Sequence, residues 1–145
     1  MTLTPILFVP EHKKEPAERL VKHCLDLDGT IVKTFSWGPD WPDIKYPHVA
    51  NAAFCWCAKQ MDEPFFWLES DSIPLKNYWL WTLQEEYEKR GLPIMLSGDF
   101  QTPFDLCCGV GAYDPSAIRW LTTDLIGPDR GFDGYLTAER DAMIS

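Results

Sequence analysis

The amino-acid sequence predicts an α/β protein, a three-layer sandwich in which helices cover both faces of a mainly parallel sheet. Short apolar or β-branched runs alternate along the chain with longer segments whose apolar residues recur at helical spacing. This alternation is typical of parallel strands that are joined by crossover helices. The chain has 145 residues, the length of one domain with a single hydrophobic core. We therefore expect residues 1–145 to form a single domain.

In the first half of the chain, proline and glycine mark the limits of the expected elements. An apolar run that closes on Pro10 predicts the first strand. Pro16 and the acidic residues beside it are typical of the first turn of a helix, and Asp28-Gly29 is a turn signal that would end this helix. A β-branched run, a proline-rich loop and an alanine-rich helix follow. The expected strands and helices of this half are 6–10, 15–28, 30–35 and 48–61.

The second half of the chain continues the alternation. The apolar run 65–68 predicts a buried strand. The segment 76–90 has an apolar side and a strongly charged side, and Gly91 is placed to cap the resulting helix. Further strands are expected at 93–96 and 106–113, with a short helix after Asp114 and a helical tail beyond Tyr135.

Composition and charge disfavour several classes of protein. The formal net charge of −9 argues against broad binding to a phosphate backbone, which needs basic patches. The five cysteines form neither a CxxC pair nor a Cys/His zinc spacing, as expected for reduced thiols in a cytosolic protein. We find no secretion signal and no apolar run approaching the roughly 20 residues that span a membrane. The expected location is the cytoplasm, and the sequence leaves the oligomeric state open.

Two carboxylates, Glu69 and Asp71, directly follow the buried strand 65–68. Side chains alternate along a strand, so these two are expected to point to the same side at its end. Ligand sites of open α/β sheets collect at the carboxyl ends of strands. Two neighbouring carboxylates repel each other unless a cation or a proton lies between them, and a hard divalent ion with a phosphate group meets that need. We therefore expect a metal site with Asp71 and Glu69 as ligands.

The loop at residues 36–47 offers a second candidate contact with a ligand. Loops of this length in compact domains are often functional. Trp37, Trp41 and Tyr46 could stack on the flat face of a ligand, or they could instead anchor the loop to the body of the domain. Trp37 stands as a candidate substrate contact.

The sequence PFFWLESDSIPLKNYWL, followed by LQEEYEKRGLPIMLSGD, resembles the core of GT-A type glycosyltransferases, especially small enzymes of phage and bacterial type. These enzymes use nucleotide-sugars as donors. In that family an acid-x-Asp motif ends a central strand and binds the divalent metal on the donor's diphosphate. The resemblance extends over residues 48–135 and is most specific over 64–115. The residues that match the pattern are Glu69, Asp71, Pro74, Trp79, Glu86, Tyr87 and Gly98.

The resemblance implies roles for further residues. Asn51 lies where such enzymes have a helix that lines the nucleotide pocket. Asp99, at an expected strand end, could supply a base or belong to a plain turn, and Asp133 falls where relatives place an acid after the acceptor loop, so both are candidate catalytic residues. The residues implied to contact the acceptor are Gly109, Gly111 and Tyr113.

The activity that the resemblance implies is a metal-dependent transfer of a sugar. A minimal or truncated GT-A-like domain would bind a nucleotide-sugar, expected to be a UDP-sugar, through Mn²⁺ or Mg²⁺ at Asp71 and Glu69. It would transfer the sugar to an acceptor hydroxyl. The acceptor could be a glycan, a small molecule or modified DNA, of which the net charge of −9 disfavours DNA.

Two alternatives stay open. Relatives complete their metal site with a C-terminal histidine, whereas His12, His23 and His48 all precede the acidic motif, so the chain could be a nucleotide-binding module without turnover. The run Asp26-Leu27-Asp28-Gly29-Thr30 resembles the nucleophile loop of haloacid-dehalogenase-like phosphohydrolases, in which both acids lie at the end of a strand. The helical spacing of residues 17–25 favours a plain helix end at this motif.

Overall fold

The computed structural model describes residues 2–10, 13–36, 48–98, 107–127, 131–132 and 135–136. The strands are β1 (Thr4–Val9), β2 (Lys33–Ser36), β3 (Phe65–Leu68), β4 (Ile94–Gly98) and β5 (Cys107–Tyr113). The helices are α1 (Lys14–Asp28), α2 (His48–Gln60), α3 (Trp79–Arg90), α4 (Pro115–Ile118) and α5 (Thr123–Ile126). Strands and helices alternate along most of the chain, and the α/β class predicted from the sequence is confirmed.

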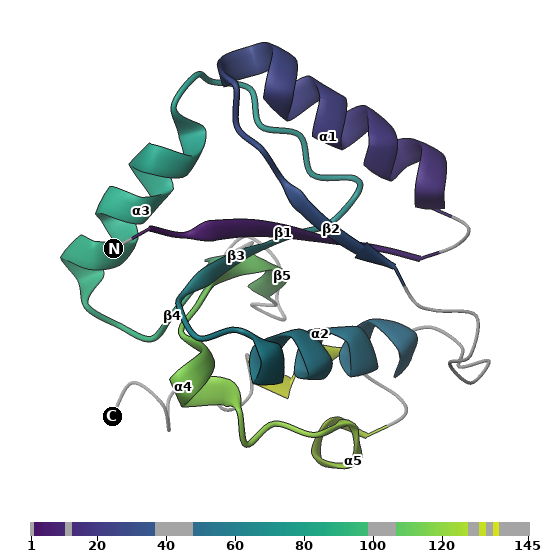
Figure 1. Ribbon diagram of the computed structural model, residues 1–145. Helices are drawn as coiled ribbons and strands as arrows, with labels where there is room; N and C mark the ends of the chain where they lie inside the picture. The colour runs from purple at the N-terminus through teal and green to yellow at the C-terminus, as the bar shows by residue number, and fades with distance from the viewer. Residues whose placement is uncertain are drawn as a thin grey trace.

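The five strands form one open mixed sheet in the order β2-β1-β3-β5-β4 (Figure 1). Strand β1 pairs in parallel with β2 on one side and with β3 on the other. Strand β5 is antiparallel to both of its neighbours, β3 and β4. Four of the five strands therefore run in one direction, and the expected mainly parallel sheet is confirmed with β5 as the reversed strand.

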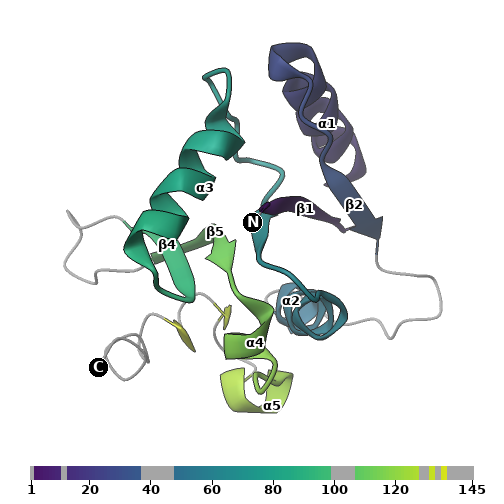
Figure 2. The same cartoon turned by 60° about the vertical axis from the view of Figure 1, so that its left-hand side comes forward.

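Helices cover both faces of this sheet. In Figure 1, α1 and α3 lie above the sheet and α2, α4 and α5 lie below it, and Figure 2 shows the same separation from another side. Alternation along β3 divides its side chains between the two layers, because Phe65 and Trp67 pack in the cluster with α2 while Phe66 and Leu68 pack in the cluster with α1 and α3. All four side chains are buried, which explains why the run reads as continuously apolar.

Two of the predicted elements begin later than the sequence indicates. Helix α3 starts at Trp79, because Tyr78 before it has a left-handed backbone with φ of 60°. Strand β2 starts at Lys33, because Thr30 is held in a turn by hydrogen bonds to Asp28. The expected helical tail and most of the loop at 36–47 lie outside the described residues.

Gly111 marks the closest approach of two strands. A Cβ atom at this position would lie 2.5 Å from the backbone oxygen of Met95 and 2.8 Å from the side chain of Leu96. A larger residue would push β4 and β5 apart, so glycine is required by packing.

None of the helices in the described part of the chain is both long enough and apolar enough to cross a membrane.

Candidate functional site

The strand order places a topological switch point at the carboxyl ends of β1 and β3. From β1 the chain first adds β2 on one side and later adds β3 on the other, so the direction of winding reverses at β1. Leu7 near the end of β1 pairs with Leu68, the last residue of β3. In open α/β sheets ligands bind outside the carboxyl ends of strands at such a switch point. The acidic residues 69 and 71 directly follow β3 and therefore lie at this position.

The backbone turns sharply at the acidic residues. The amide N–H of Ser72 donates to the carbonyl of Glu69 at 2.9 Å, which makes residues 69–72 a hydrogen-bonded turn. The strand alternation from which Glu69 and Asp71 were expected to share a side does not reach these residues, because β3 ends at Leu68. The turn leaves Glu69 half-buried and Asp71 exposed to solvent.

Helix α1 holds the segment between this turn and α3 by two side chains. The Nε2 atom of His23 lies 2.6 Å from the carbonyl oxygen of Pro74. Since a carbonyl oxygen only accepts, Nε2 carries the proton and donates it to this bond. The backbone N–H of Tyr78 donates to Oδ2 of Asp28 at 2.8 Å. These contacts fix residues 72–78, which Figure 1 shows running from the end of β3 past α1 to the start of α3.

Asp28 also closes the turn at the end of its own helix. Its Oδ1 accepts from the backbone N–H of Thr30 at 3.0 Å and from the hydroxyl of Thr30 at 2.6 Å. The hydrogen bond from the Thr30 hydroxyl is the main reason that the pKa of Asp28 is lowered, and the backbone donors of Thr30 and Tyr78 add to it. We call the set of bonds from His23 to Pro74 and from Asp28 to Thr30 and Tyr78 the α1 clasp.

The structure of α1 distinguishes between the two interpretations of residues 26–30, a helix end and a phosphohydrolase motif. Asp26 and Asp28 lie in the last turn of α1, and Gly29 ends the helix with a left-handed φ of 80°. The predicted helix end is confirmed, and the strand on which the phosphohydrolase motif depends is a helix in this chain. His23 and the contact between Asp28 and Tyr78 were not identified from the sequence. The Asp-Gly-Thr run does signal the local bonds from Thr30 to Asp28.

Asn51 lies in the core, where it holds a distant segment. It is fully buried in α2, and its Oδ1 accepts from the backbone N–H of Phe132 at 2.7 Å. A buried amide engaged in this way is not placed to contact a nucleotide. The structure thus gives Asn51 a packing role in place of the expected cofactor contact.

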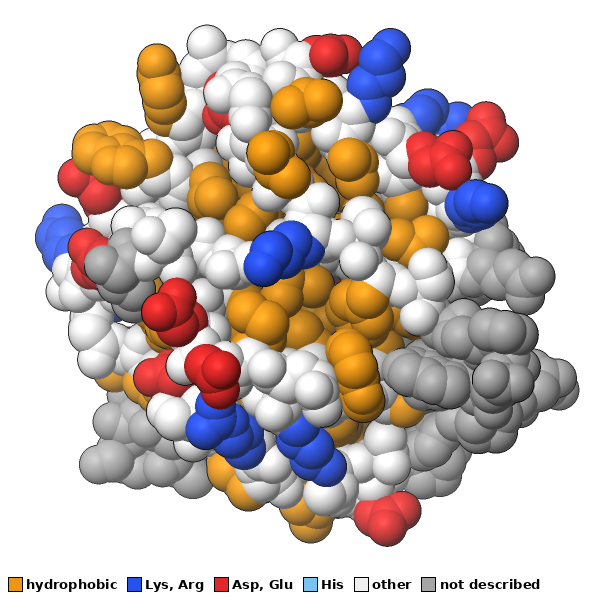
Figure 3. Space-filling model, in the orientation of Figure 1, with side chains coloured by type: hydrophobic (Ala, Val, Ile, Leu, Met, Phe, Trp, Pro, Cys, Tyr) orange, Lys and Arg blue, Asp and Glu red, His pale blue; other side chains and the backbone are white. Residues whose placement is uncertain are grey.

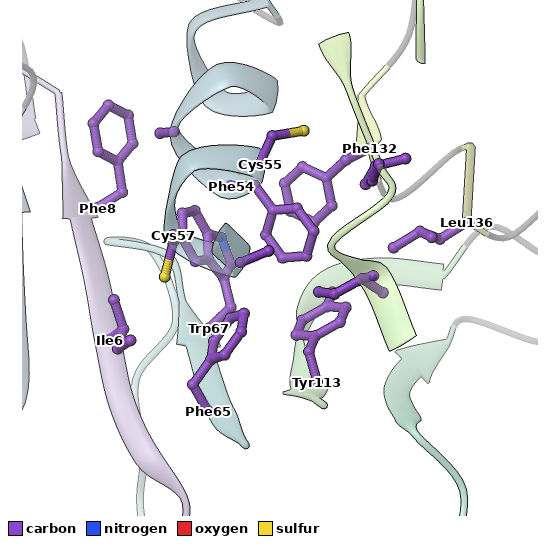
Figure 4. Close-up of a cluster of buried hydrophobic side chains, with 14 of the residues drawn as sticks. Ile6, Phe8, Phe54, Cys55, Cys57, Phe65, Trp67, Tyr113, Phe132 and Leu136 are labelled. Carbon is purple, nitrogen blue, oxygen red and sulfur yellow. The ribbon is translucent and has the colours of Figure 1, made fainter. Parts of the chain in front are cut away.

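Tyr113 lies at the other edge of the sheet from the acidic turn. It pairs with Phe65 at the start of β3 and with Ile94 at the start of β4. It is fully buried and packs edge-on against Phe54, with 4.8 Å between the ring centroids (Figure 4). The expected contact with an acceptor does not fit this position, because β5 runs antiparallel and carries its last residue away from the carboxyl end of β3.

Of the remaining candidate residues, two lie on β5 and three lie outside the residues that the structure describes. Gly111 pairs with Trp67 near the end of β3, and Gly109 lies two residues closer to the carboxyl edge along β5. Trp37, Asp99 and Asp133 lie outside the described residues. Of the expected site residues, Glu69 and Asp71 lie in one turn after the carboxyl end of β3, and Gly109 and Gly111 lie on β5, the strand next to β3.

The described residues include no group of three or more His, Cys, Asp or Glu side chains that could hold a metal ion. The buried thiols are also poor nucleophiles, since burial raises the pKa of Cys57 to about 12 and that of Cys55 to about 11. The turn after β3 carries two carboxylates, and a hard cation bound there would take its other ligands from a phosphate group and water.

Comparison of the chain with protein-family models, with curated proteins and with solved structures finds no match in any of the three.

Proposed function

We propose that this protein is a metal-dependent glycosyltransferase that takes a sugar from a nucleotide-sugar donor, as the resemblance of residues 64–115 to GT-A enzymes implies. The observation that supports the proposal most directly is the position of the acidic turn. It follows a fully buried strand at the switch point of an open α/β sheet, where ligands of this fold class bind.

The side chains at the turn fit a divalent cation bound to a diphosphate. Asp71 is exposed and offers carboxylate oxygens, which are the ligands that Mg²⁺ and Mn²⁺ prefer, and Glu69 lies beside it. Mg²⁺ is commonly held by one or two carboxylates together with substrate phosphates. When bound, such an ion would neutralise charge on the nucleoside diphosphate leaving group.

In this proposal the chain's own residues fix the position of the carboxylates. The hydrogen bond from Ser72 to Glu69 sets the shape of the turn, and His23 and Asp28 fix the segment that leaves it. A ligand group held by a fixed backbone loses less conformational freedom when the donor binds. The α1 clasp thus acts by positioning the turn, while Asp71 makes the contact.

Isothermal titration of UDP in the presence of Mn²⁺ tests the site. We expect Asp71→Asn to weaken binding at least tenfold, because it removes a charged ligand of the ion. Asp26→Asn is the matched control, since Asp26 is an exposed aspartate on α1 and the substitution changes the net charge equally. Equal affinity in the wild type and in Asp71→Asn would refute the site.

Incubation with UDP-sugars and candidate acceptors separates the enzyme from the binding module. Consumption of donor that Asp71→Asn abolishes supports transfer, whereas Mn²⁺-dependent binding without consumption of any donor supports a module without turnover. Release of phosphate from a simple ester, lost in Asp26→Asn, would support the phosphohydrolase and overturn the proposal.

A further inference from the structure

A group of large apolar side chains is exposed where α1 and α3 approach each other. Figure 3 shows hydrophobic side chains gathered over the upper part of this face, where α1, α3 and the segment between β3 and α3 lie in Figure 1. We call the following residues the apolar patch: Ile31 (76% exposed), Ile73 (62%), Leu75 (81%), Tyr78 (71%) and Trp81 (59%).

The α1 clasp joins the two parts of the chain that carry the apolar patch. The carboxylate of Asp28 accepts hydrogen bonds from both Thr30 and Tyr78. Because Ile31 directly follows Thr30, these bonds bring Ile31 and Tyr78 close together. His23 binds the carbonyl of Pro74, which lies between the remaining two loop residues of the patch. Trp81 lies in the first turn of α3, three residues after Tyr78 in the sequence.

The backbone beneath the patch is held in a conformation that costs energy. Tyr78 has φ of 60°, an uncommon value for any residue other than glycine, and its N–H is fixed by Asp28. An aromatic side chain presented from a fixed backbone loses little freedom on contact with a partner. Tyr and Trp are also the residues that most often carry binding energy in protein interfaces.

The area of the apolar patch is that of one side of a protein interface. If a large side chain exposes about 200 Å² when fully accessible, the five exposures together amount to on the order of 700 Å². The largest apolar patch of a typical monomer is about 300–600 Å². A stable interface of standard size buries about 800 Å² on each partner. The patch therefore has nearly the area that a stable dimer requires.

The charges beside the patch favour a second copy of this chain as the partner. The chain has a net charge of −9, so two copies repel unless they meet where local charge is balanced. Exposed residues of both signs lie close in the sequence to residues of the patch, namely Lys33 and Lys76 and the acids Asp71 and Glu85. In a two-fold interface the same surface faces itself, so each lysine can lie opposite an acid of the other copy.

We propose that the apolar patch is the interface of a homodimer with two-fold symmetry. This inference does not depend on the proposed glycosyltransferase activity, because none of the five apolar residues of the patch is a proposed metal ligand, and Asp71 is the one flanking charge that belongs to both proposals.

Sedimentation velocity and light scattering of the full chain at about 10 μM and about 100 μM test the dimer. We expect the mass of two chains for the wild type at the higher concentration and the mass of one chain for Leu75→Glu, with the dissociation constant raised at least tenfold. Leu125→Glu is the matched control, since Leu125 is 49% exposed on α5, across the sheet, and this variant is expected to remain a dimer.

A monomeric wild type at the higher concentration overturns the proposal, as does a dimer that survives Leu75→Glu unchanged. If the circular dichroism spectrum shows that Leu75→Glu is unfolded, Trp81→Glu provides a second variant that disrupts the patch. Flotation with vesicles of neutral phosphatidylcholine identifies the other occupant, because a monomer that floats would assign the patch to a lipid surface and would also overturn the dimer.

Discussion

The two faces of the sheet are stabilised by different kinds of contact. Beneath the sheet, rings pack on rings: Phe54 of α2 stacks on Phe132 with 3.9 Å between centroids and meets Trp67 at 5.2 Å (Figure 4). Above the sheet, α1 packs through small and aliphatic side chains, namely Ala17, Leu20 and Cys24, and α3 adds one edge-on contact of Trp79 with Phe66 at 5.9 Å between centroids. The α1 face also has the clasp, a set of polar bonds around the segment that follows the acidic turn. The comparison teaches that the described aromatic residues serve mainly the core, while polar contacts organise the candidate site.

The largest expected effect is the loss of the central ring beneath the sheet. Phe54→Ala should lower the free energy of unfolding by about 3–5 kcal/mol, because it removes a fully buried ring and leaves a cavity among its neighbours. Urea denaturation followed by far-ultraviolet circular dichroism measures this. Leu20→Ala on the α1 face provides the comparison, and a cost for Leu20→Ala above that for Phe54→Ala would contradict the unequal roles of the two faces.

A second effect concerns the polar bond within the aromatic face. Asn51→Ala should cost about 1–3 kcal/mol, because the buried N–H of Phe132 loses its Asn51 acceptor. Gln60→Ala, at an exposed position of the same helix, should change stability very little. If both substitutions shifted the urea midpoint equally, the hydrogen bond from Phe132 to Asn51 would contribute nothing measurable to the free energy of unfolding.

A smaller effect is expected for the clasp on the α1 face. Asp28→Ala should cost about 1–1.5 kcal/mol at pH 7, since Asp28 is half-buried and water can replace part of the three lost hydrogen bonds. Chemical denaturation of the wild type and the variant gives this difference, and Asp26→Asn serves as the control on the same helix.

The pH dependence of that difference has a definite sign. The pKa of Asp28 in the folded protein is lowered below its ordinary value of 3.8, so its charge-dependent stabilisation is complete above the unfolded pKa. It is lost as the pH falls through the lower, folded pKa. The gap in stability between the wild type and Asp28→Ala should therefore shrink in acid, and a gap that widened below pH 3.8 would show that the ionised carboxylate is not the stabilising form.

Local patterns predicted most of the fold, because each element carries its own signal. The run Phe65–Leu68 is buried on both faces and was identifiable as an uninterrupted apolar strand. Gly29 and Gly91 end their helices with positive φ, as their positions after a helical pattern indicate. The start of α3 was predicted too early, because the left-handed Tyr78 depends on Asp28, a partner 50 residues away.

The candidate site was less predictable, since it depends on strand direction and on distant partners. Asp71 was identified from its place after a strand, but the turn that exposes it follows from a hydrogen bond across residues 69–72. Tyr113 looked like a contact residue because its sequence context does not reveal that β5 is reversed. The bond between Asn51 and Phe132 could not be inferred from local sequence, since it spans 81 residues.

The strand order also bears on how the chain folds during synthesis. At the centre of the sheet, Thr4–Leu7 of β1 pairs with Phe65–Leu68 of β3. This pairing can form only after more than sixty residues beyond the start of β1 have been synthesised. Until Gly111–Tyr113 arrive, β3 has one open edge and carries four large apolar side chains. An unpaired apolar strand is a template for association with other chains. The nascent protein is therefore expected to need protection by chaperones during the interval between the emergence of β3 and that of β5.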